Sequence, residues 1–194
     1  MSEYWMLEVR TPKGQRRAVI GKQPNLRDLS STVFLDWLSG NRFPIEIPEP
    51  LQFQLDPDGG NFLTDFFPPA IPLMSVNMLD ALTLAGVDNI DSYEAILLDR
   101  SGSPIQEEYR AINIIGSVAC ADLENSDCEV DHFDDPVGVD FNSLVIDETR
   151  TNNLLFFRLH EAPNGIVIHD SVRSQLEPLN LSGIQFLKPE DWIG

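Results

Sequence analysis

One segment, LLFFRLHEAPNGIVIHDSV at positions 154–172, gathers the side chains best suited to acid–base or nucleophilic chemistry. Polar residues alternate with Phe157 and Leu159 in FFRLH, and alternate residues of a strand share a face, so Arg158 and His160 should project together. A hydrolase could combine these two side chains with one of the chain's many acids. The structural alternative is an ion pair, because a buried guanidinium needs an acidic partner.

Nucleophilic catalysis finds little support elsewhere in the sequence. Ser171 follows His169 and Asp170 at the expected start of the last helix, where Asp or Ser caps free N–H groups. A hydrolase triad usually takes its nucleophile and base from separate parts of the fold, and the GxSxG elbow is absent. Glycine-rich phosphate loops, Walker motifs and HExxH are absent as well. We therefore expect no catalytic residues.

Acidic side chains dominate one stretch of the chain. Between Ala111 and Thr149 there are ten acids and no Lys or Arg, whereas six of the 13 basic residues lie in the first 27 positions. A calcium loop of the EF-hand type needs Gly at its sixth position and Glu at its twelfth, and neither stands at the right offset, so we expect no metal site. The expected role is to bind a partner protein. The candidate residues are Asp122, Glu124, Asp127, Glu129, Asp131, Asp134 and Asp135.

The overall charge and the N-terminus narrow the class of protein. Thirteen basic and 31 acidic side chains give a net charge of -18, which opposes binding to nucleic acid and favours a basic partner. The start, MSEYWMLEVR, is charged where a signal peptide is apolar, and no apolar run approaches the roughly 18 residues of a membrane span. We expect a cytoplasmic protein that binds neither membranes nor cofactors. Cys120 and Cys128 have no CxxC spacing and should be reduced thiols.

Short apolar runs separated by turns indicate the elements that position these residues. At 194 residues the chain suits one domain. YWMLEV and the turn TPKGQRR predict a hairpin, and a helix should follow from Asn25 to Gly40, so 1–50 form a basic N-terminal segment packed on a main domain of 51–194. Further runs such as YRAINIIG and IVIHD predict strands. The expected fold is α+β, with a mostly antiparallel sheet of about six to eight strands and about three helices.

Two segments are similar when the sequence is shifted by 94 positions, LMSVNMLDALTLAGVDNI from Leu73 and VIHDSVRSQLEPLNLSGI from Val167. Each predicts a strand, a helix and a second strand. Gly86 falls opposite Asn180, and both residue types suit the left-handed end of a helix. The alternatives are an internal duplication and chance similarity between two common units.

Several motifs resemble the family of immunity proteins first noticed in myxobacteria, which are encoded beside bacterial toxins. They are LMS before a helix ending at GV, then DLENS, LVID, FFRL and LSGIQF, and the resemblance covers 51–189. It implies a protein that neutralises a cognate toxin by binding it, with no established catalytic residue. It also implies that the matching recurrent positions act as caps, turns and ion pairs. Those positions are Ser75, Gly86, Asp122, Ser126, Asp147, Arg158 and Gly183.

Charge and resemblance together predict a non-enzymatic immunity protein that blocks a toxin, with an acidic surface that fits a basic cleft. The alternatives from other classes are a hydrolase that uses acids with Arg158 or His160, and a scaffold that escorts the toxin. The scaffold would bind the toxin without loss of its activity. No pattern in the sequence indicates an oligomeric state.

Overall fold

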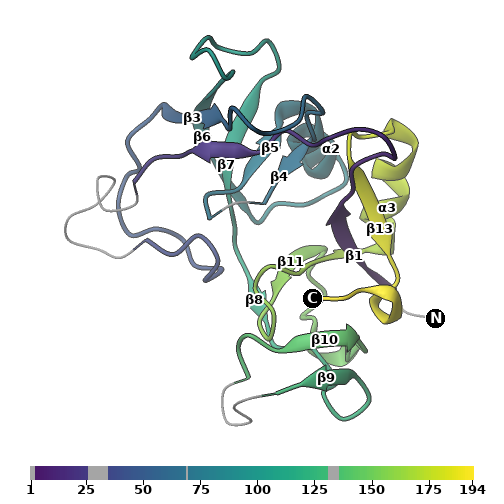
Figure 1. Cartoon of the computed structure of the whole chain (residues 1–194). Coiled ribbons are helices and arrows are strands. Elements are labelled where there is room, and N and C mark those ends of the chain that lie inside the picture. Colours follow the sequence, from purple (N-terminus) through teal and green to yellow (C-terminus); the bar gives the residue numbers. More distant parts are fainter. Residues whose placement is uncertain (1–2, 26–34, 69, 131–135) are drawn as a thin grey trace.

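The computed structural model describes residues 3–25, 35–68, 70–130 and 136–194 (Figure 1). They form a single α+β domain, and eight of the ten strand pairings are antiparallel, as expected. The strands build three sheets, however, in place of the one predicted. Apolar runs indicate that strands exist, but four-residue strands carry little information about which other strand they join.

The first sheet has the order β13–β1–β12–β11–β8, from β1 (Tyr4–Val9), β8 (Ser117–Val118), β11 (Phe156–Leu159), β12 (Ile166–His169) and β13 (Ile184–Leu187). The second has the order β2–β3–β6–β7–β5–β4, from β2 (Ile20–Lys22), β3 (Leu51–Leu55), β4 (Phe66–Phe67), β5 (Leu73–Ser75), β6 (Ile90–Leu98) and β7 (Tyr109–Ile114). The third pairs β9 (Asp127–Glu129) with β10 (Asp140–Ser143). The helices are α2 (Val76–Leu84), α3 (Asp170–Leu176) and the 3-10 turns η1 (Glu148–Arg150), η2 (Glu177–Leu179) and η3 (Pro189–Asp191).

Two short α-helices in the described residues do not match the expected number of about three. Most of the helix expected between Asn25 and Gly40 lies outside the described residues. Its last part, 35–40, forms a turn instead, in which the Asp36 carboxylate accepts from the Leu38 N–H (2.8 Å). An Asp side chain that bonds the backbone two residues on favours a turn over a helix. No helix of the described residues is long and apolar enough to cross a membrane.

The first strand does not form the predicted N-terminal hairpin. β1 lies between β12 and β13 and is antiparallel to both. Its alternate side chains pack into two different cores, with Met6 fully buried on one face and Leu7 only 5% exposed on the other. A strand with two apolar faces belongs inside a sheet covered on both sides, and the polar segment that follows β1 offers no such partner.

The two segments related by the shift of 94 form equivalent units. In each, a strand leads into a helix capped by its preceding residue. A left-handed residue ends the helical segment of each unit, Gly86 (φ +92°) after α2 and Asn180 (φ +51°) after η2, the 3-10 turn that continues α3. A third strand lies between the two strands of each unit, β7 in the first and β1 in the second. In the first unit, four residues on neighbouring strands pair in succession: Phe67, Leu73, Ala111 and Tyr93. In the second unit, the residues that pair in succession at the equivalent place are Phe157, Val167, Met6 and Leu187.

Aromatic packing repeats in the same places. Phe67 meets Tyr109 edge-on with ring centroids 5.6 Å apart and planes at 63°, and Phe157 meets Tyr4 at 5.8 Å and 64°. The helices α2 and α3 contact each other across a shared apolar core. Agreement in register, ring geometry and helix ends favours duplication over chance. The third strand of the second unit, β1, comes from the start of the chain.

Candidate functional site

The acid-rich stretch forms the two-stranded sheet of β9 and β10. Its inner face holds Cys128 and Phe141, which pair with each other, and Phe141 is only 2% exposed. Alternation therefore turns Asp127 and Glu129 outward, and both are exposed, as is Asp140 on the neighbouring strand. We name the exposed side chains of Asp127, Glu129 and Asp140 the acidic ribbon.

The acidic ribbon carries uncompensated charge. Glu129 and Asp140 stand directly opposite each other across the two strands, and like charges in that position are destabilising by up to about 1 kcal/mol. None of the salt bridges between described residues involves the ribbon. Asp140 was not among the predicted site residues, because only the pairing of β10 with β9 brings it beside Glu129. A surface that keeps such repulsion is suited to a positively charged partner.

The remaining predicted partner-binding residues differ in their surroundings. Asp122 is half-buried, and its carboxylate accepts from the Asn125 backbone N–H (3.2 Å) and side-chain amide (2.7 Å). Ser126 donates to the Asp122 carbonyl (2.7 Å), so Asp122 shapes the turn before β9. Glu124 is exposed on that turn and extends the acidic surface. Asp131, Asp134 and Asp135 lie outside the described residues.

Arg158 lies in the interior of the first sheet and is 2% exposed. Its Nη1 donates to the carbonyl of Pro163 (2.8 Å), and it has no salt bridge with any described residue, so the expected ion pair does not form there. Burial lowers the pKa of the guanidinium to about 10, and the charge of Asp36 acts in the opposite direction. The alternation in FFRLH predicted the face of Arg158 but contained no information about the distance to an acid.

His160 contacts the strand with which Arg158 pairs, β8. Ser117 pairs with Arg158 in register, and its Oγ lies 3.1 Å from Nδ1 of His160. That distance suits a nucleophile and its base, but a hydrolase also needs a cavity that admits the substrate. The described cavities have other lining residues. Within the ranges that the structure covers, no three His, Cys, Asp or Glu side chains are placed to hold a metal ion.

Glu161 is a buried acid beside this pair. Its Oε1 accepts from the Ala121 N–H (3.2 Å), and the side chain lies in the core with only 2% of the residue exposed. Burial is the largest cause that raises its pKa, and backbone hydrogen bonds oppose the shift. The folded protein therefore favours the protonated carboxyl, and ionisation of Glu161 lowers the stability.

Replacement Glu161→Gln should raise the free energy of unfolding at neutral pH by about 1 kcal/mol, because it removes a buried charge and keeps the acceptor for Ala121. The folded pKa lies above the unfolded one, so wild-type stability falls as the pH rises from the ordinary glutamate value of about 4.3 through the raised value. Urea unfolding across this range should show a difference that grows with pH. Lower stability of the variant at every pH would contradict this account.

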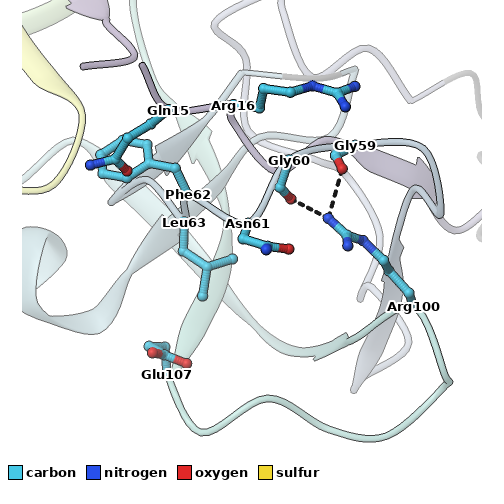
Figure 2. A pocket seen from close by; sticks show the side chains of 9 residues that line it. All are labelled: Gln15, Arg16, Gly59, Gly60, Asn61, Phe62, Leu63, Arg100 and Glu107. Atoms are coloured by element: carbon cyan, nitrogen blue, oxygen red, sulfur yellow. Dashed lines mark hydrogen bonds between the residues drawn. The ribbon is translucent and has the colours of Figure 1, made fainter. Parts of the chain in front are cut away.

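Figure 2 shows the residues that line a cavity that the sequence did not indicate. The volume of this cavity is about 670 Å³. Arg100 donates from Nη2 to the carbonyls of Gly59 (2.7 Å) and Gly60, and Arg16 donates to the carbonyl of Asp58 (2.9 Å). Glycine is required at position 60, because a Cβ there would lie 1.7 Å from the carbonyl oxygen of Arg16. Both guanidinium groups therefore bind backbone carbonyls of the 58–60 loop.

Six of the seven positions singled out by the family resemblance lie at caps and turns, and the seventh, Arg158, lies within β11. Ser75 accepts from the Met78 N–H (3.2 Å) at the start of α2, and Gly183 has a φ of +70° before β13. Asp147 accepts from the Thr149 N–H (3.1 Å) and hydroxyl (2.6 Å) and pairs with Arg150 (2.8 Å). The bond from the Thr149 side chain is the main cause that lowers the pKa of Asp147.

Comparison with known families agrees with this picture. The model of the Immunity protein family (Imm11) matches residues 4–191, which extends the resemblance from 51–189 to the N-terminal segment that contains β1. A comparison with curated proteins found no match. Because the family model spans nearly the whole chain, the chain belongs to the Imm11 immunity protein family.

Proposed function

We propose that this chain binds a cognate bacterial toxin in the cytoplasm and blocks it without catalysing a reaction. Membership of an immunity protein family supports a role in toxin immunity. The acidic ribbon supports the mode of binding, because it presents three outward carboxylates that no salt bridge with a described residue neutralises.

The ribbon's charge acts mainly on the encounter with the toxin. Complementary potentials steer two proteins together and raise the association rate, and they disfavour partners of the wrong charge. The net charge of -18 adds a long-range field of the same sign. A toxin that acts on nucleic acid and presents a basic cleft fits such a surface best.

Charge reversal of the ribbon tests this mode of binding. The double variant Asp127→Lys and Glu129→Lys should slow association with the toxin about tenfold at low salt, and the difference should shrink as salt screens the charges. Stopped-flow mixing at two salt concentrations measures the rate. The matched control reverses two exposed acids at α2, Asp80→Lys with Asp88→Lys, which alters the net charge equally.

Equal association rates for the two double variants would mean that the toxin binds a surface other than the acidic ribbon. Growth of cells that co-express the toxin tests the wider proposal, since an immunity protein must restore growth. Toxicity that persists despite binding of the two purified proteins would support the toxin-escorting scaffold instead.

A further inference from the structure

Within the described residues, the edge of the first sheet leaves backbone groups of β13 without a strand partner. In the strand order of these residues β13 is last, and its pairing is with β1 (Figure 1). The Arg10 N–H donates to the Gly183 carbonyl (2.8 Å), so Arg10 and Gly183 are a hydrogen-bonded pair of this antiparallel ladder. Hydrogen-bonded and non-hydrogen-bonded pairs alternate along such a ladder, and Phe186 and Lys188 fall at non-hydrogen-bonded positions. The N–H groups of both residues and the carbonyl of Phe186 therefore point away from β1.

A cavity of about 410 Å³ opens beside this edge. Leu176, Leu181, Ile184 and Phe186 form its apolar lining, and Glu177, Asn180 and Gln185 form its polar lining. Leu179, on the neighbouring turn η2, is 53% exposed. The edge therefore offers both backbone donors and a place for an apolar side chain.

The equivalent edge in the first unit is covered by the chain itself. There residues 90–93 of β6 correspond to β13, and β3 pairs in parallel with the residues that follow, 95–98. Just before β3, the Glu49 carboxylate accepts from the Glu94 N–H, and Arg42 pairs with Asp91 (2.5 Å). The described residues place no such segment against β13. The chain thus covers one of the two equivalent edges with side chains of its own, and within the described residues it leaves the other open.

Acidic side chains without a salt bridge to any described residue stand at one end of the open edge. They are the exposed Glu190 and Asp191, which follow the strand. Glu177, which lines the cavity, is already paired with Arg173 (2.6 Å). A second copy of this chain is a poor occupant, since each copy carries a net charge of -18. A segment with a basic residue close to an apolar one fits the charges and the cavity together.

We propose that the edge of β13 is a docking strand for an extended segment of the toxin, an inference that rests on the proposed function. The segment adds to the sheet through the outward backbone groups of Phe186 and Lys188, seats an apolar side chain in the cavity, and places Lys or Arg near Glu190 and Asp191. This contact is distinct from the acidic ribbon, which lies on another sheet.

The test removes one outward N–H group and leaves the fold intact. Lys188 has a φ of -65°, the value that proline requires, so Lys188→Pro fits the backbone. Both Lys188→Pro and Lys188→Ala lose the ammonium group that stacks on Trp5 at 3.7 Å, but only the first loses the N–H. We expect the toxin, supplied as the purified product of the adjacent reading frame, to bind Lys188→Pro about tenfold more weakly than Lys188→Ala.

Amide hydrogen exchange separates the failure of this inference from that of the proposed function. The amides of Phe186 and Lys188 should exchange quickly in the free protein and slow down in the toxin complex. Toxin binding with equal affinity for the two variants and no added protection would overturn the docking strand and leave the immunity role standing. No binding to the wild-type protein would overturn both. Protection that depends on the concentration of the free protein would assign the edge to a second copy.

Discussion

Deletion of residues 1–9 is expected to abolish folding of the chain. The deleted segment contains β1, which joins β12 to β13 and buries Met6 in one core and Leu7 in another. Loss of a central strand removes two ladders of backbone hydrogen bonds and opens both cores, and this exceeds the roughly 5–15 kcal/mol by which domains are stable. Near-UV circular dichroism and urea unfolding should show no fixed tertiary structure and no cooperative transition.

Complementation supplies the control for this deletion. A synthetic peptide of residues 3–10 should restore cooperative unfolding when it is mixed with the shortened chain, because it can re-enter between β12 and β13. A peptide of the same composition in scrambled order should not. A shortened chain that folds alone would mean that the N-terminal segment is an accessory of an independent domain.

Local features of the sequence predicted local structure well. Ser75 before an apolar helix pattern and Gly86 after it indicated α2 with its two ends, since a cap and a left-handed residue act within a few positions. The same pattern at Asn180 indicated the second unit, and Pro178 follows the end of α3 as a helix-terminating residue should. These elements depend on neighbours in the sequence, so spacing alone carries the information.

Pairing over long distances could not be predicted in the same way. β1 joins strands more than 150 positions away, and nothing in YWMLEV distinguishes that partner from a hairpin. Asp140 joins the acidic ribbon only because β10 folds back on β9. The open edge of β13 depends on which segment fails to cover it, which requires the complete strand order.

Arg158 shows how a correct local prediction led to a wrong partner. Alternation in FFRLH put its side chain on the same face as that of His160, and the abundance of acids suggested an ion pair. The structure instead surrounds the guanidinium with protein and gives it the carbonyl of Pro163 as its acceptor. Composition counts acids over the whole chain, whereas an ion pair needs one acid within 4 Å.

Replacement Arg158→Met should therefore stabilise the protein, by roughly 2 kcal/mol, because a buried charge without an acidic partner is costly and methionine fills a similar volume. The folded pKa of Arg158 is lowered to about 10, so the charged form is disfavoured in the fold and the penalty persists at all lower pH values. The gain should be constant across neutral pH and should decline only as the pH approaches 10, where the wild-type arginine starts to lose its proton in the folded state.

Urea unfolding of Arg158→Met and wild type at several pH values measures this gain. Arg158→Ala serves as the control, since it also removes the charge but leaves a cavity that costs a few kcal/mol and should offset the benefit. A loss of stability in Arg158→Met that disappears on acidification would instead reveal an acidic partner, because protonation of that acid would remove the pair from the wild type as well.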